Sequence, residues 1–211
     1  MITLFARQGW GSAIVEAQLE WYGLEYRLEE VGDLFASAEA RAGLSRINPL
    51  VQIPTLVLPG GEVMTESAAI TLYLADLTGR TDLVPGPRDQ ERAAFLRWLV
   101  FLVTNVYPTF TYADDPARFV ALQEAQPGFR SAVDDYARRL WTFVDDAASA
   151  QPWFLGQRFS AIDIYVAVMA RWRPGREWFV TNARRLHAIA LAADQQERLT
   201  GTWRRNFPAG A

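Results

Sequence analysis

The sequence contains no cysteine, no lysine and only one histidine. The absence of cysteine excludes disulfide bonds, thiolate metal sites and a protein thiol as the nucleophile. The single histidine, His187, lies in a helical pattern, which favours a structural role, and it does not support a multi-histidine metal site or a Ser-His-Asp triad. We therefore predict that the protein binds no metal.

The charge is modestly acidic, with a net value of -3 and arginine as the only basic residue. Without a basic footprint, no nucleic-acid partner is expected. The most apolar stretch, Phe95 to Tyr112, is interrupted by Arg97, Asn105 and Pro108, and we interpret it as a buried helix that cannot supply an unbroken membrane-length segment. Because no signal peptide is visible at the start, we expect a cytoplasmic protein without a membrane partner.

The length of 211 residues predicts two small domains. Between residues 81 and 92 the composition turns to proline, glycine and charged residues, as in a connector. We predict an α/β domain over residues 1–80, a linker over 81–90 and an all-helical domain over 91–211.

The first half alternates strand and helix patterns. Strand-like runs at Ile2–Ala6 and Glu25–Val31 enclose a helical pattern at Ala13–Tyr22 that stops at Gly23. The following elements are expected as a helix at 35–44, a hairpin with strands at 55–58 and 62–64, and a helix from 65 to 79. The predicted order is β-α-β-α-β-β-α.

The second half shows no clear strand pattern. Its helical periodicities cover residues 91–106, 116–123, 128–150, 161–171, 177–189 and 191–200.

Three segments carry a family resemblance. They are Asn48-Pro-Leu-Val-Gln-Ile-Pro54, Thr65-Glu66-Ser67 followed by Ala69-Ile70 and Tyr73-Leu74, and Phe159-Ser160-Ala-Ile-Asp163. Together with the domain order, they resemble the cytosolic glutathione S-transferases over nearly the entire chain. The resemblance implies a thioredoxin-like N-terminal domain, a helical C-terminal domain, glutathione as co-substrate, a small apolar electrophile and a homodimer.

In this family the proline that matches Pro54 is cis, and an X-Pro bond is where a cis peptide is affordable. Such a turn would leave the amide and carbonyl of Ile53 facing outward, able to pair with a peptide backbone as an edge strand does. Glutathione offers one suitable peptide unit. The alternative is that Pro54 only shapes a turn. Gln52, where the family often has a basic residue, would bond the glycyl end.

Glu66 and Ser67 open a predicted helix, where unpaired amides and the positive end of the dipole favour a carboxylate. We expect the Ser67 hydroxyl and amide to hold the γ-glutamyl carboxylate and Glu66 to accept from the ligand ammonium. The alternative is a plain helix cap. Ser160 and Asp163 fit a capping box with Phe159 as the staple, and we assign that pair to stability.

The chemistry of such a site requires the glutathione sulfur as a thiolate, because the thiolate is the nucleophile and the free thiol has a pKa of about 8.5. Lowering that pKa by roughly two units needs about 2.7 kcal/mol. Ser12, at the mouth of the first helix, is the candidate for this role, and a pure N-cap is its alternative. Phe5-Ala6-Arg7 offers no tyrosine for tyrosine-type activation, and the lack of cysteine disfavours thiol-transferase activity.

The electrophile pocket of this family lies between the domains. Trp10, flanked by two glycines, is one candidate for its lining, although it could equally be a packing residue. Of the aromatic residues Trp98, Phe101, Tyr107, Phe110 and Tyr112, we expect most to pack in the core and Tyr107 and Tyr112 to face the pocket. The predicted activity is addition or substitution of the glutathione thiolate on a small apolar electrophile. Ether cleavage, dehalogenation and isomerisation remain open, as does a catalytically weak binding or interaction module.

Overall fold

A computed structural model describes residues 1–208. The chain forms two compact units, one made of Met1–Val84 together with the segment that starts at Asp194, the other of Pro85–Ala193. The last three residues of the predicted 91–211 domain lie outside the described residues. The boundary at Val84 falls within the segment expected to be a linker.

A four-stranded sheet forms the centre of the first unit. Its strands are β1 (Ile2–Ala6), β2 (Tyr26–Glu30), β3 (Thr55–Val57) and β4 (Val63–Met64), in the spatial order β2-β1-β3-β4. Strand β1 is parallel to β2 and antiparallel to β3, and β3 is antiparallel to β4. A parallel β-α-β unit followed by a hairpin is the arrangement that the sequence pattern predicts.

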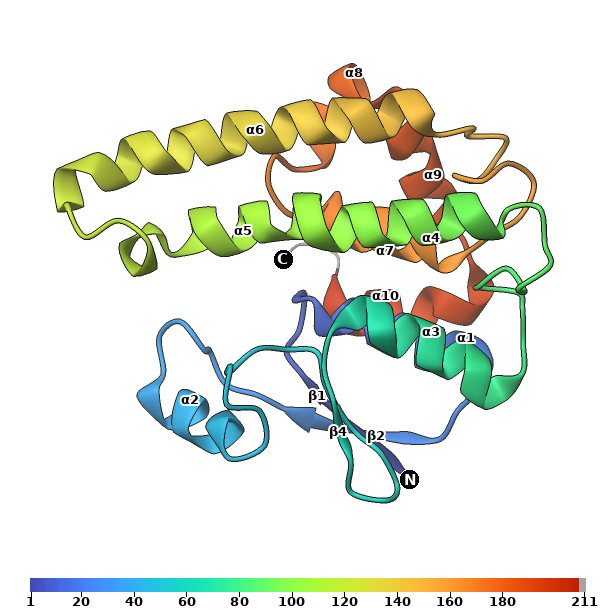
Figure 1. Cartoon of the computed structure of the whole chain (residues 1–211), viewed down its shortest axis with the longest axis horizontal. Coiled ribbons are helices and arrows are strands. Elements are labelled where there is room, and N and C mark those ends of the chain that lie inside the picture. Colours follow the sequence, from blue (N-terminus) through green and yellow to red (C-terminus); the bar gives the residue numbers. More distant parts are fainter. Residues whose placement is uncertain (209–211) are drawn as a thin grey trace. The chain divides into compact units, whose positions relative to one another are not determined.

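Helices cover both faces of this sheet. Helices α1 (Ser12–Tyr22) and α3 (Ser67–Thr78) lie side by side (Figure 1), and α1 packs on β1, which buries every second residue. The other face of β1 carries Phe5, which packs in a cluster with residues of α2 (Ala38–Ser45). The order β-α-β-α-β-β-α is confirmed, and the unit is thioredoxin-like.

The C-terminal segment belongs to this first unit by its contacts, which differs from the predicted 91–211 domain. The 3-10 turn η4 (Glu197–Leu199) and helix α10 (Thr200–Asn206) both contact α1. Leu199, Thr202 and Trp203 are buried. Sequence periodicity cannot reveal this, because a helical stripe shows which face is buried and not which part of the chain covers it.

Helices build the second unit. They are α4 (Arg92–Phe101), η1 (Leu102–Val106), α5 (Tyr107–Asp114), α6 (Gln126–Ala147), α7 (Ala161–Met169), α8 (Arg176–Asn182) and α9 (Arg184–Asp194), with 3-10 turns η2 (Pro116–Arg118) and η3 (Gln123–Ala125). All nine residues of α7 are buried, so this helix lies in the core. The helical character expected for this region is confirmed.

One long helix includes the stretch from Phe95 to Tyr112 that we interpreted as a helix, and it continues past residue 106, where the predicted helical periodicity ended. Helix α4, the π-helical segment η1 and α5 follow one another without a break from Arg92 to Asp114, as Figure 1 shows. Pro108 stands in the first turn of α5, directly after the π-helical segment, where the register of backbone bonds changes and its missing N–H is tolerated. By length and composition alone this helix could cross a membrane, a test that core helices also pass.

Two other helix predictions are wrong in detail. Residues 116–123 hold only the short turn η2 and the start of η3, and the helix predicted over 177–189 is divided into α8 and α9 at Ala183. Ala183 has φ -144° and ψ 65°, which no helix contains.

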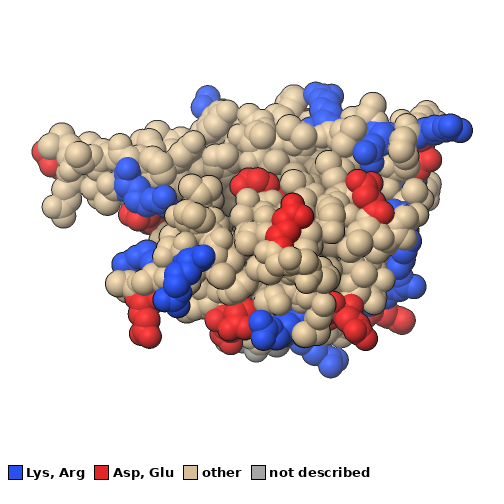
Figure 2. All heavy atoms as spheres, turned by 60° about the horizontal axis from the view of Figure 1, so that its bottom comes forward, with Lys and Arg blue, Asp and Glu red and all other residues tan. Residues whose placement is uncertain are grey.

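Arginines of the second unit form ion pairs with nearby aspartates. Arg173 contacts Asp114 at 2.6 Å and Asp134 at 3.1 Å, and Arg138 contacts Asp135 at 2.6 Å. On the face drawn in Figure 2, acidic and basic side chains alternate among the described residues.

Candidate functional site

Three chain segments meet at one end of the sheet in the first unit. Strand β1 ends there at Ala6, next to the start of β3, because Phe5 pairs with Thr55. Strand β4 ends at the same place, because its last residue Met64 pairs with Leu56. The loop before α1, the loop before β3 and the start of α3 therefore lie beside one another, and these segments carry the predicted glutathione residues Ser12, Gln52, Ile53, Pro54, Glu66 and Ser67.

The loop before β3 is fixed from within by Asn48, which is buried. Its amide donates to the Gln52 carbonyl and to the Thr55 hydroxyl, each at 3.0 Å, and its oxygen accepts from the Leu50 amide at 3.0 Å. The Ile53–Pro54 bond is cis, as the resemblance implies. Pro54 is buried and Gln52 is exposed.

Ile53 offers an unused peptide unit. Its amide and carbonyl make no hydrogen bond to any described residue, while its side chain is partly buried against an apolar cluster. A free amide and carbonyl beside a sheet can accept an added strand, which is the pairing expected for the peptide of glutathione.

Helix α3 begins with a strained residue. Glu66, its N-cap, has φ 64°, a value that costs a residue other than glycine on the order of 1–3 kcal/mol. Ser67 follows as the first helical residue and is 8% exposed. Within the described part of the chain, the Ser67 hydroxyl has no hydrogen-bond partner. Glu66 is exposed, with the Thr65 hydroxyl 3.4 Å from its carboxylate.

Ser12 is not the N-cap of α1, so that alternative is wrong. The N-cap is Gly11, and Ser12 is the first helical residue, fully buried. The Ser12 hydroxyl donates to the Arg7 carbonyl at 3.1 Å and accepts from the Arg7 amide at 3.1 Å. Since the hydroxyl proton is already donated, the side chain closes the loop between β1 and α1.

The backbone of that loop keeps two donors unused. The amides of Gly11 and Ser12 have no hydrogen-bond partner among the described residues, whereas the Trp10 amide donates to Arg7 and the Ala13 amide to Trp10. Gly11 and Ser12 are both buried. Unpaired buried amides at the positive end of a helix suit an anion.

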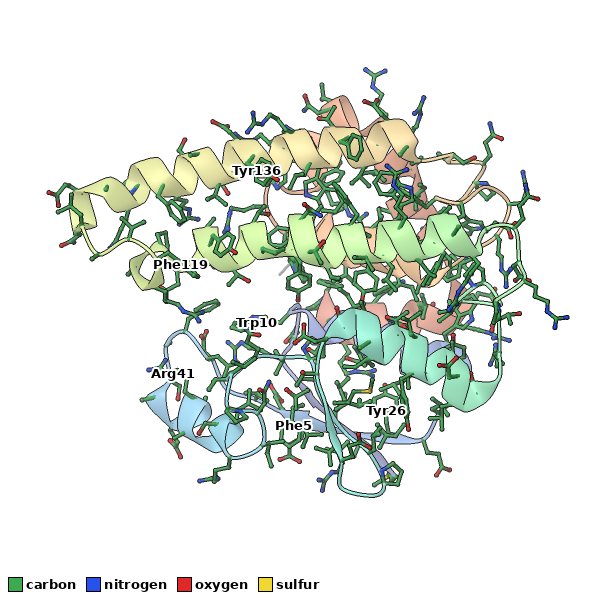
Figure 3. The ribbon with its side chains drawn as sticks, in the orientation of Figure 1. Phe5, Trp10, Tyr26, Arg41, Phe119 and Tyr136 are labelled. Atoms are coloured by element: carbon green, nitrogen blue, oxygen red, sulfur yellow. The ribbon has the colours of Figure 1, made fainter. Side chains whose placement is uncertain are left out.

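Trp10 lies in the loop between β1 and α1 (Figure 3). It is partly buried and packs against the cluster of Val31, Leu34 and Leu44. Its ring centroid lies 5.1 Å from that of Phe35, and the Arg7 guanidinium lies 5.3 Å from it. These contacts show a packing role, and the partial exposure leaves part of the ring accessible.

The two candidate tyrosines lie in the second unit. Tyr107 packs edge-on against Phe110 and Trp172, with centroids 6.2 Å and 5.5 Å away. Tyr112 is 41% exposed and packs against Phe119 at 4.9 Å.

The predicted capping box in the second unit is present. The Asp163 carboxylate accepts from the Ser160 amide at 2.8 Å and from the Ser160 hydroxyl at 3.0 Å. It also accepts from the Phe154 amide at 2.8 Å, so it joins the start of α7 to the preceding loop.

Sequence reasoning missed three residues that hold the loops at this end of the sheet. Asn48 stands in one of the three resemblance segments, but the segment does not show its side-chain hydrogen bonds. Glu16 is a buried carboxylate of α1, and Asn206 of α10 contacts both Glu16 and the loop before α1. A charged residue within the apolar helix pattern of Ala13–Tyr22 was the available signal for Glu16. Among the described residues, no group of three potential metal ligands occurs.

The fold and these loops define a class of protein. It has a thioredoxin-like unit, in which the residue before a cis proline keeps its amide and carbonyl unpaired, and a helical unit. A family model for the glutathione S-transferase N-terminal domain matches residues 12–77. The chain is 38% identical over 206 residues, 98% of each chain, to a protein of Escherichia coli K12 called uncharacterized GST-like protein YncG. The chain belongs to the glutathione S-transferase family, and its class is that of the glutathione transferase enzymes.

Other similar proteins are also glutathione S-transferases or their homologues. Glutathione S-transferase GstA of Escherichia coli O157:H7 is 29% identical over 149 residues, 71% of this chain and 66% of that protein. A glutathione transferase homologue from Sulfitobacter, whose crystal structure contains bound glutathione, superposes with a TM-score of 0.85 at 23% identity and covers 95% of this chain and 96% of its own. The latter likeness supports the fold.

Proposed function

We propose that this chain binds glutathione at the end of the sheet in its first unit and joins the glutathione thiolate to a small apolar electrophile, by addition or by displacement of a leaving group. The observation that carries the proposal is the set of unused polar groups on three adjacent loops. They are the amide and carbonyl of Ile53, the amides of Gly11 and Ser12, and the hydroxyl of Ser67.

Each group matches one part of glutathione. The Ile53 peptide unit pairs with the central peptide of the ligand, as an added strand would. The start of α3, with Ser67 and the helix field, receives the γ-glutamyl carboxylate, and the exposed Glu66 accepts from the ligand ammonium. We assign the exposed Gln52 to the glycyl end, where it would add a hydrogen bond and no charge.

The remaining donors are left for the sulfur. We infer that Ser12 stabilises the thiolate through its backbone amide, together with that of Gly11 and the field of α1. Two such bonds to an anion, at about 1.5–3 kcal/mol each, are of the order needed to lower a thiol pKa by one to two units. The side-chain role that we first assigned to Ser12 would require its bond to the Arg7 carbonyl to break.

We propose the binding surface for the electrophile from residue type alone. Trp10, Tyr107 and Tyr112 supply aromatic surface suited to a small apolar molecule. The family resemblance also supports a homodimer and a cytoplasmic location. Sedimentation of the purified chain would test the homodimer. Exposed large apolar side chains on both units offer candidates for its contacts, among them Leu77 and Val100.

Calorimetry with glutathione tests the proposal. Wild type should bind, and Ser67→Ala should weaken binding by about tenfold, because a hydrogen bond to a charged carboxylate is lost. S-methylglutathione should still bind, since the peptide contacts do not involve the thiol. Failure of the wild type to bind either ligand would overturn the proposal.

A rate assay with an aryl halide separates the enzyme from the alternative binding module. The enzyme should consume the halide faster than glutathione in buffer does. Tight binding without any rate above buffer, across a panel of apolar electrophiles, would favour the module.

A further inference from the structure

The C-terminal helix reaches the loop that precedes α1. Asn206, at the end of α10 and 5% exposed, accepts a hydrogen bond through Oδ1 from the Gly9 amide at 3.2 Å. Gly9 has φ 75°, and a Cβ added there would lie 3.5 Å from the Asn206 carbonyl oxygen. The loop and the helix end are thus in direct contact within the first unit.

The orientation of the Asn206 amide is fixed by its other bonds. Its Nδ2 donates to the Glu16 carboxylate at 2.8 Å and to the Thr202 carbonyl at 3.1 Å. Both acceptors need the NH₂ group, so the oxygen can only face Gly9. The carboxamide therefore joins a donor in the loop to an acceptor on α1.

The buried carboxylate of Glu16 requires the partners that α10 supplies. Its side chain is 2% exposed, and a buried carboxylate is costly unless it is paired. Arg205 binds one carboxylate oxygen and Asn206 the other. Burial raises the pKa of Glu16, and the hydrogen bond from Asn206 and the charge of Arg205 oppose that rise. Arg205 also contacts the Tyr26 hydroxyl at 3.3 Å, on β2 (Figure 3).

Glu16 and Ser12 are one helical turn apart and lie on the same side of α1. The hydrogen bonds between Ser12 and Arg7 therefore close the two ends of the loop, and Asn206 holds its middle at Gly9. Between these ties lie the amides that face the proposed thiolate position. Movement of Gly9 would move Trp10 and Gly11 with it.

We propose that Asn206 is a positioning residue of the glutathione site: it holds the loop from Arg7 to Gly11 so that the Gly11 and Ser12 amides face the sulfur. This inference rests on the proposed function and extends it, since it makes the far end of the chain part of the glutathione site.

The primary test is Asn206→Leu, which keeps side-chain volume and removes both halves of the contact. In the ligand-free protein, hydrogen exchange at the Gly9 amide should accelerate at least about tenfold. The dissociation constant for glutathione should rise about fivefold or more, and the bound thiol should ionise closer to the free pKa of about 8.5. A purely structural residue would leave the bound thiol pKa unchanged.

A matched control removes one hydrogen bond from the C-terminal end of α1, the helix that carries Ser12 and Glu16. The indole of Trp21 donates to Asp82 at 2.7 Å, so Trp21→Phe loses a comparable bond far along α1 from Gly9. It should leave Gly9 exchange and the bound thiol pKa at wild-type values.

A second pair of variants keeps the test valid if Asn206→Leu fails to fold. Asn206→Asp places two carboxylates together and should loosen the loop. Adding Glu16→Gln exchanges the amide and the acid, so that the amide introduced at position 16 can donate to the carboxylate introduced at position 206, while that carboxylate still accepts from Gly9. Glutathione affinity should rise above that of Asn206→Asp without reaching the wild-type value, because the Thr202 carbonyl still faces an acceptor in place of the Asn206 NH₂ group.

Unchanged Gly9 exchange in Asn206→Leu, or wild-type glutathione affinity in Asn206→Asp, would overturn the inference, as would faster exchange with unchanged affinity and thiol pKa. Absence of recovery in the double variant would also overturn it. Because Gly9 exchange is measured without glutathione, it decides whether Asn206 holds the loop even if the wild type fails to bind glutathione, a result that would instead overturn the proposed function.

Discussion

At the residue scale, Asp163 combines complete burial with three hydrogen bonds, two from Ser160 and one from the Phe154 amide. Burial raises its pKa to about 7, although the hydrogen bonds oppose the rise. An unfolded aspartate has a pKa of about 3.9. Between those two values the folded chain holds a proton that the unfolded chain has released.

Stability should therefore fall as the pH rises through this interval, by up to about 1.4 kcal/mol per pH unit from this group. The contribution is complete below about pH 4 and lost above about pH 7. Asp163→Asn should be less stable at every pH, because its NH₂ would face N–H donors, and it should lack this slope. Urea unfolding across the interval measures both, and equal slopes in the two proteins would contradict the assignment.

The local structure at the proposed glutathione residues was predictable where a local motif exists. Pro54, Glu66 and Ser67 stand in short segments whose chemistry depends on neighbouring residues. The bond from Asn206 to Glu16 joins residues 190 positions apart, and no sequence period connects them. The position of Ser12 was predicted, but its hydroxyl bonds to Arg7 depend on how the loop folds back.

At the element scale, the start of α3 places a charged residue in a strained conformation. Glu66→Gly should stabilise the chain by about 1 kcal/mol, because glycine adopts φ 64° without steric cost. It should also weaken glutathione binding by loss of the carboxylate that accepts from the ligand ammonium. Urea midpoints and calorimetry measure the two effects.

Glu66→Gln is the matched control, since it keeps the strain and removes the charge. It should weaken binding without stabilising the fold. A Glu66→Gly protein less stable than wild type would show that the conformation at this position carries no strain.

Elements with a strong local signal were predicted well. The strands and helices of residues 1–79 appear in the expected order, because glycine stops and the hairpin turn separate them clearly. A helix was expected from Phe95 to Tyr112, but the π-helical segment that accommodates Pro108 within it leaves no pattern in the sequence.

At the scale of the whole molecule, the first unit includes the C-terminal segment. A chain ending at Ala193 would leave the Glu16 carboxylate without Arg205 and Asn206. Removing the partners of a buried charge costs about 3–5 kcal/mol, a large part of a typical total stability of about 5–15 kcal/mol. The truncated chain should lose glutathione binding and be cut rapidly by proteases.

Glu16→Gln in the truncated chain should recover part of the lost stability, because it removes the unpaired charge. Wild-type protease resistance and glutathione affinity after truncation would contradict the role of this segment. The boundary could not be predicted because composition marks a connector at 81–92 but carries no signal for the return of the chain at Asp194.

The most direct measurement of the central claim is a pH titration of thiolate absorbance for glutathione bound to wild type, Ser12→Ala and Ser12→Pro. Proline is tolerated at the first helical position and removes the amide as well as the hydroxyl. The account predicts a bound thiol pKa one to two units below the free value of about 8.5 in wild type, most of that shift retained in Ser12→Ala, and its loss in Ser12→Pro. An unshifted pKa in wild type, or abolition of the shift by Ser12→Ala alone, would contradict it.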